Sequence, residues 1–154
     1  MRYWLMKTEP ATFGVEHLAA ALRRTSAWDG VRNFQARNML RDEMRRGDQA
    51  FLYHSSCAVP GIVAVMQIVK QGYPDRTAFD RKHHHYDADS DPGNPRWFMV
   101  DVRLQRRLAR TIALEELRAH AGKELKGMVL LRPGNRLSIT PVEAAHWKFI
   151  LSLE

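Results

Sequence analysis

Polar and aromatic residues gather where apolar segments of this chain end. A pocket for a flat nucleic-acid base needs this combination, because an aromatic face stacks on the base while short donors and acceptors bind its edge. The residues of these types are Lys7, Thr8, Glu9, Trp28, Tyr53, His54, Ser55, Ser56 and Trp97. Any single tryptophan is more often part of a core than of a binding site, and we expect Trp147 to be purely structural.

Metal and phosphate chemistry have weaker support. The chain contains no glycine-rich phosphate-binding motif, which argues against nucleotide hydrolysis. A tract of three histidines, His83 to His85, consists of metal-ligand residues, and several aspartates follow it. Adjacent residues of a strand point to opposite faces, so neighbouring histidines cannot easily share one ion. We therefore expect a solvated loop here, with no metal ion and no cofactor.

Two catalytic arrangements are conceivable. Cys57 follows His54 by three residues, but a thiol nucleophile needs a base and an orienting group within hydrogen-bond reach, and no third member is evident. Glu9 and Asp29 could pair for acid–base catalysis, although such residues at strand ends more often make caps and loop hydrogen bonds. We expect no catalytic residue.

The chain is basic, with 24 Lys and Arg against 17 Asp and Glu and a net charge of +7. This balance favours a polyanionic partner such as nucleic acid, although many basic proteins bind no anion specifically. Each of three arginine groups could be a solvated face or could follow a phosphate backbone. The groups are Arg41, Arg45 and Arg46; Arg103, Arg106, Arg107 and Arg110; and Arg132 and Arg136.

The bulk properties predict one small domain over residues 1–154. The single cysteine, Cys57, cannot form an internal disulfide, so nothing points to an oxidising compartment. The longest apolar stretch, Gly61 to Met66, is too short to cross a bilayer, and no signal-peptide run follows Met1. We expect a cytoplasmic monomer with no membrane partner.

Hydrophobic periodicity predicts strands interleaved with a few helices, without regular βαβ alternation. Strands are expected at residues 3–7, 49–54, 62–69, 97–105 and 136–139. Helices are expected at 15–23, between Asn33 and Gly47, from about 111 to 121, and from Thr140 onward. Thr140-Pro141-Val142-Glu143 resembles a capped helix start, with Val142, Ala145, Phe149 and Leu153 on the buried face. The long segment 73–95 has no period and is expected to be a functional loop.

Several motifs, in order along nearly the whole chain, resemble those of the EVE domain family. They are Tyr3 to Pro10 (YWLMKTEP), Trp28 to Asn38 (WDGVRNFQARN), Phe51 to Ser55 (FLYHS), Pro60 to Val63 (PGIV), Asn94 to Val102 (NPRWFMVDV) and Leu131 to Ser138. The family usually has Ser where this chain has Thr8, which keeps the hydroxyl and adds a methyl group. The histidine tract falls in the family's variable loop.

The resemblance implies an α+β, PUA-like fold, with a curved, barrel-like mixed sheet of five or six strands flanked by short helices. It also implies a non-catalytic nucleic-acid-binding module without a cofactor, since several members bind modified cytosine bases. Carried over to matching positions, it implies that Trp28 stacks on an extruded base. It further implies that Glu9, Asn33 and Ser55 bind the base edge and that Lys7 and Arg32 meet phosphate. The full implied set is Lys7, Thr8, Glu9, Trp28, Arg32, Asn33, Tyr53, Ser55 and Trp97.

Two other functions remain open from the sequence. One is an enzyme acting on modified nucleosides or nucleic acid, with Lys7 and Glu9 as the acid–base pair. The other is an interaction domain whose pocket is vestigial. The sequence does not distinguish DNA from RNA, because no motif encodes a contact to the 2′-hydroxyl.

Overall fold

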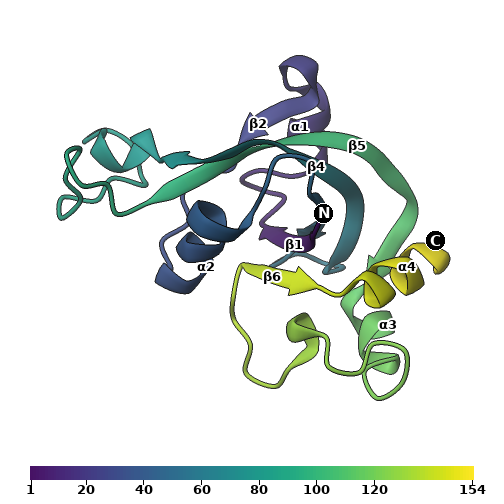
Figure 1. Cartoon of the computed structure of the whole chain (residues 1–154). Helices are drawn as coiled ribbons and strands as arrows, with labels where there is room; N and C mark the ends of the chain where they lie inside the picture. Colours follow the sequence, from purple (N-terminus) through teal and green to yellow (C-terminus); the bar gives the residue numbers. More distant parts are fainter.

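A single mixed sheet of six strands organises the chain (Figure 1). The computed structural model describes all 154 residues. The strands are β1 (Tyr3–Thr8), β2 (Thr25–Ala27), β3 (Gln49–His54), β4 (Gly61–Pro74), β5 (Phe98–Ala113) and β6 (Ile139–Val142). The helices are α1 (Val15–Ala20), α2 (Phe34–Asn38), α3 (Leu114–Ala119) and α4 (Ala144–Ser152). The expected α+β class is therefore confirmed.

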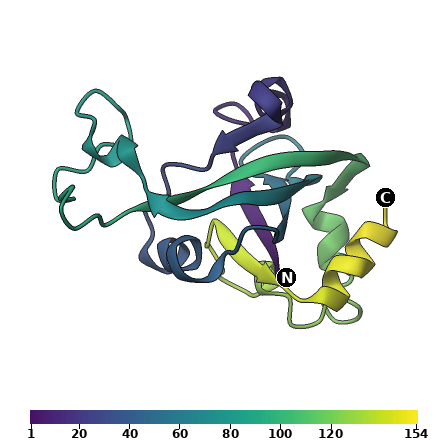
Figure 2. The same cartoon turned by 45° about the horizontal axis from the view of Figure 1, so that its top comes forward.

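The sheet order is β2-β5-β4-β3-β1-β6, and every neighbouring pair is antiparallel except β1 with β3. The two longest strands, β4 and β5, pair with several register shifts. Such irregularities increase the bend and twist of a sheet, and these two strands curve strongly around the domain in Figures 1 and 2. The sheet stays open, because β2 and β6 do not pair with each other.

The two faces of the sheet bury separate apolar clusters. Side chains alternate across a strand, so Trp4 and Met6 of β1 belong to the first cluster and Leu5 belongs to the second. The first cluster is covered by α1, α2 and the π-helical turn η2 (Met39–Glu43). The second is covered by α3, α4 and the 3₁₀ turn η4 (Val129–Leu131), which lie together in Figure 1.

A buried carboxylate fixes the start of β1 against the turn before β3. Asp48 is almost fully buried. It accepts hydrogen bonds from the Arg2 amide at 3.0 Å, the Trp4 indole at 3.0 Å and the Arg45 amide at 2.9 Å. A buried charge is tolerated only when it is hydrogen-bonded in this way, so Asp48 sets the register of the parallel pair.

The last helix begins later than the sequence predicts. Thr140, Pro141 and Val142 belong to strand β6, and Glu143 is the extended residue before α4. Proline is tolerated there because β6 is an edge strand and no further strand needs its missing amide. The helix-start prediction at Thr140 is therefore wrong, and the strand predicted at 136–139 begins only at Ile139 and continues to Val142, because pairing with β1 decides the structure of this segment.

The buried face of α4 also differs from the prediction. Its buried residues are His146, Trp147 and Ile150, whereas Ala145 is exposed and Phe149 is only half-buried. The structural role of Trp147 is confirmed, since its ring is stacked 3.9 Å from Phe51 and 4.6 Å from Tyr3 between ring centroids.

The remaining differences concern the ends of elements. Strand β4 extends to Pro74 and β5 to Ala113, so both are longer than predicted. Helix α1 ends at Ala20, and a 3₁₀ turn (Leu22–Arg24) with Arg23 and Arg24 at φ of 56° and 51° follows. The segment after Pro74 forms a short 3₁₀ turn, η3 (Arg76–Phe79), and then irregular turns that extend to the left in Figure 1.

No helix of the chain is both long enough and apolar enough to span a membrane.

We expect Trp147→Ala to lower the free energy of unfolding by about 3–5 kcal/mol, because it removes the aromatic centre of the second cluster. The neighbouring Lys148 is exposed, and Lys148→Ala should change stability by no more than about 0.5 kcal/mol. Urea unfolding of both variants measures this. Equal losses in the two variants would contradict the buried face described for α4.

Candidate functional site

A cavity of about 420 Å³ opens beside the end of β1. It is lined by Lys7, Thr8, Thr12 and Phe13 from β1 and the turn after it, by residues 26–32, by His83 to His85 and by Ser138. Four separate segments of the sequence thus meet at one site. The cavity has the size range of small-molecule pockets in proteins.

Four of the nine residues implied by the family resemblance line this cavity: Lys7, Thr8, Trp28 and Arg32. The other five, Glu9, Asn33, Tyr53, Ser55 and Trp97, lie outside it.

Lys7 has a half-buried side chain at the end of β1. Its ammonium makes no side-chain hydrogen bond or ion pair within the chain, and its nearest aromatic contact is the Tyr53 ring, 5.8 Å from Nζ to the centroid. Burial lowers the pKa of Lys7, because desolvation disfavours the charged form. The amine therefore has no polar partner within the chain, and it lies on the side of Tyr53, the neighbour of Lys7 across the β1–β3 pair.

Trp28 forms part of the cavity wall and also belongs to the first apolar cluster. Its side chain is only 7% exposed, and its ring meets Phe13 edge-on at 6.4 Å between centroids. The Trp28 amide donates to the Val100 carbonyl at 2.8 Å. The indole is thus held in place by packing, as a stacking surface for a base would need to be.

Arg32 is tied into the fold by its guanidinium. It donates to Asp75 Oδ2 at 3.0 Å and to the His85 carbonyl at 2.7 Å, and its side chain is 24% exposed. The backbone amide of Gly30 donates to the same Asp75 oxygen at 2.8 Å. Most donors of Arg32 are therefore occupied within the protein, which limits its ability to bind phosphate.

Asp75 is the fully buried centre of this network. Its second oxygen, Oδ1, accepts from the amide and the hydroxyl of Thr77 at 2.9 and 2.6 Å. Burial alone would raise the pKa of the Asp75 carboxyl, but the hydrogen bonds from Thr77, Gly30 and Arg32 outweigh burial and place the pKa below its ordinary value. The network joins residues 30–32 to the segment that carries the histidine tract.

Asn33 and Trp97 have structural partners of their own. The Asn33 side-chain oxygen accepts from the Ala36 amide at 2.9 Å and so caps α2, as its position before the helix predicts. The Trp97 indole donates to Asp87 at 2.6 Å, and its ring is stacked on Phe34 with centroids 4.9 Å apart.

Glu9, Tyr53 and Ser55 also lie outside the cavity. Glu9 is exposed, and its carbonyl accepts from the Thr12 and Phe13 amides in the turn after β1. Tyr53 is 3% exposed and packs in the second cluster, on the other face of the sheet. The Ser55 amide donates to the Thr8 carbonyl at 2.9 Å and continues the pairing of β3 with β1.

Sequence reasoning missed several wall residues, among them Phe13, Ser26, Gly30 and the histidine tract. The glycine turn after Trp28 marked one of these segments, whereas nothing in the sequence placed the histidines opposite that turn. Two catalytic pairs were conceivable from the sequence, Cys57 with His54 and Glu9 with Asp29. His54 accepts a hydrogen bond from the Val15 amide at 3.1 Å and so fixes the start of α1. Asp29 lines the cavity, whereas Glu9 lies outside it.

Most arginines of the β5 group are paired with carboxylates. Arg106, Arg107 and Arg110 bind Glu154, Glu16 and Glu116, each through two hydrogen bonds. Ten exposed arginines make no ion pair and are available to phosphate: Arg23, Arg24, Arg45, Arg46, Arg76, Arg81, Arg103, Arg118, Arg132 and Arg136.

The fold and the motifs together define a family. The EVE domain model matches residues 2–153, so the chain belongs to the EVE domain family. Thymocyte nuclear protein 1 of Homo sapiens is 46% identical over 167 residues, which cover 99% of this chain and 73% of that protein. The Danio rerio protein of the same name is 47% identical over 166 residues, which cover 98% of this chain and 71% of that protein.

Solved structures agree with this assignment. The crystal structure of human THYN1 protein in complex with 5-methylcytosine containing DNA has a TM-score of 0.94 and 45% identity, and covers 99% of this chain and 97% of that one. Protein PSPTO5229 from Pseudomonas syringae has a TM-score of 0.91 and 42% identity, over 98% of both chains. A YTH domain from Zygosaccharomyces rouxii, 13% identical with a TM-score of 0.54 over 99% of this chain and 85% of that one, shares the fold.

We expect Asp75→Ala to lower the free energy of unfolding by about 3 kcal/mol, because it leaves Arg32 and the Gly30 amide without their partner. Hydrogen exchange should become faster in residues 28–32 and 75–87. The exposed Asp89 offers a matched control, and Asp89→Ala should leave exchange in residues 28–32 unchanged. Unchanged exchange there in Asp75→Ala would show that the network does not hold the two segments together.

The lowered pKa of Asp75 gives a second test. The folded state favours the ionised carboxylate, so its contribution is complete above the ordinary aspartate pKa of about 3.9 and is lost as the pH falls through the lower folded pKa. The unfolding free energy of the wild type should therefore rise more steeply with pH below about pH 4 than that of Asp75→Asn. Parallel pH profiles for the two proteins would contradict this assignment.

Proposed function

We propose that this chain is a non-catalytic nucleic-acid-binding module whose cavity accepts one extruded base, with methylated cytosine as the first ligand to test. The observation that carries the proposal is the cavity beside β1, whose lining includes the fixed indole of Trp28 and the residue Lys7. An extruded base is recognised by stacking and by hydrogen bonds to its edge, and these two groups supply an example of each.

The relatives support the same ligand class. The human THYN1 structure, with which this chain shares 45% identity over nearly its whole length, is a complex with DNA that contains 5-methylcytosine. A single base has an apolar face and a polar edge, and the cavity wall likewise contains both apolar and polar residues. Whether the natural ligand of this chain is DNA or RNA is part of the test below.

The surface charge suits a nucleic-acid backbone. The chain carries a net charge of +7, and Arg23 and Arg24 follow α1 directly before β2, whose Ser26 and Ala27 line the cavity. Arg136 lies two residues before Ser138, which lines it from another side. Binding through these arginines would weaken as salt rises, whereas contacts inside the cavity would depend on the base.

An enzymatic function has less support from the geometry. The acid–base pair considered from the sequence was Lys7 with Glu9, and Glu9 is exposed outside the cavity. A vestigial pocket would give only salt-sensitive binding that ignores the base. The cytoplasmic location and the monomeric state expected from the sequence remain part of the proposal.

We expect the chain to prefer an oligonucleotide with one 5-methylcytosine over its unmodified match, and to keep that preference at high salt. The measurement is a fluorescence titration of DNA and RNA oligonucleotides, with and without the methyl group, at two salt concentrations. Trp28→Ala should lose about 1–3 kcal/mol of binding free energy, and Lys7→Met about tenfold in affinity. Thermal melting confirms that both variants are folded.

Lys148→Met provides the matched control, because Lys148 is exposed on α4 and should leave base preference unchanged. Base-independent binding that disappears at high salt would support the vestigial pocket. Wild-type affinity in both Lys7→Met and Trp28→Ala would exclude the cavity as the binding site.

A further inference from the structure

We propose that His83, His84 and His85 form a binding site for a first-row divalent transition metal ion, such as Zn²⁺, at the edge of the cavity. The site does not depend on the proposed function, because the three side chains and their supports are independent of any nucleic-acid ligand.

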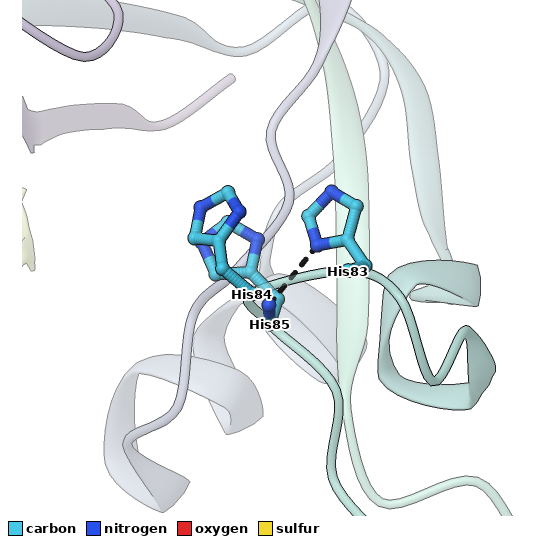
Figure 3. A group of neighbouring side chains, drawn as sticks. All are labelled: His83, His84 and His85. Carbon is cyan, nitrogen blue, oxygen red and sulfur yellow. Dashed lines mark hydrogen bonds between the residues drawn. The ribbon is translucent and has the colours of Figure 1, made fainter.

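The three imidazoles converge although they are neighbours in the sequence (Figure 3). Each offers a ring nitrogen, and these atoms lie within 4.8 Å of one another. The ring centroids are 4.6 Å apart for His83 and His84, 3.9 Å for His84 and His85, and 4.9 Å for His83 and His85. The expectation that the rings diverge assumed a strand, whereas residues 81–85 form turns.

The tract is held from both sides. Within it, the His85 amide donates to His83 Nδ1 at 3.0 Å, the contact dashed in Figure 3. Because Nδ1 accepts here, the neutral ring carries its proton on Nε2, so His83 binds a metal ion only once this hydrogen bond is given up and the lone pair of one ring nitrogen turns to the ion. From outside, Arg32 donates to the His85 carbonyl at 2.7 Å, and Arg32 is itself fixed by the buried Asp75. The histidines therefore belong to a supported turn.

The His85 ring lies directly against Gly30. A Cβ atom at Gly30 would lie only 2.2 Å from His85 Cε1 and 2.4 Å from Nε2, so only glycine allows this ring position. Gly30 also has a φ of +79°, which glycine adopts without strain. His85 Nδ1 is buried and has no hydrogen-bond partner, and buried polar atoms of this kind need an explanation.

Imidazole nitrogen is a preferred ligand of Zn²⁺, Ni²⁺ and Cu²⁺. Three histidines with an open fourth position are a known zinc arrangement, with Zn–N distances of about 2.0–2.1 Å. Tetrahedral geometry then requires nitrogens about 3.3 Å apart. The donors therefore have to approach each other by about 1.5 Å at most, through rotation of the exposed His84 side chain and a small shift of His83 or His85.

All three histidines line the cavity. Coordination positions that they leave open are therefore reachable from the cavity, and water or an oxygen or nitrogen atom of a bound ligand could fill one of them.

The test is a titration of the full-length chain, prepared without a histidine tag, with Co²⁺ and Zn²⁺. Calorimetry gives stoichiometry and affinity, and the visible absorption of Co²⁺ reports the ligand geometry. We expect one ion per chain, bound at least about tenfold more tightly than by a synthetic peptide of residues 80–87, because the fold positions the donors. Binding no tighter than that of the peptide would overturn the proposal.

Variants then locate the site. His83→Ala and His84→Ala should each abolish the one-ion binding, whereas His120→Ala should preserve it, because His120 pairs with Glu124 elsewhere in the chain. Gly30→Ala changes no ligand but displaces the His85 ring, and should weaken binding about 10- to 100-fold. Thermal melting checks that each variant is folded. Wild-type affinity in His84→Ala, or in a folded Gly30→Ala, would overturn the site described here.

Discussion

The carboxylate of Asp75 is the interaction on which the cavity depends. A fully buried negative charge is unfavourable unless it is surrounded by donors, and Asp75 meets that condition with the Gly30 amide, the Arg32 guanidinium and Thr77. The same bonds fasten the irregular segment after β4 to the turn after β2. Without them, the histidine tract would have no fixed position beside Trp28, and the cavity would lack one of its walls.

Elements with a strong internal pattern could be predicted from the sequence, and elements decided by distant partners could not. The strand at Gln49–His54 and the capping of α2 by Asn33 follow from local residue order. The segment Thr140 to Glu143 has the residues of a helix cap, but its backbone pairs with β1 instead. Such tertiary pairing outweighs a capping preference of about 1 kcal/mol, and local sequence does not reveal it.

The site shows the same division. Lys7, Thr8 and Trp28 were singled out because they end apolar segments, and all three line the cavity. Trp97 met the same criterion, yet it donates to Asp87 and stacks on Phe34, since a hydrogen-bond partner ten residues away cannot be deduced from residue type. The residue types of the histidines indicate metal chemistry, but the convergence of their rings depends on a turn whose geometry is set by Arg32 and Gly30.

The position of β1 in the sheet has a consequence for how the chain folds. This strand lies between β3 and β6, so that Leu5 is opposite Phe51 on one side and Thr140 on the other. Its second partner is at the far end of the sequence, and closing so long a loop is an entropic cost that slows folding. During synthesis, β1 must therefore wait for β6 with one edge unpaired, exposed to any other extended chain that could pair with it.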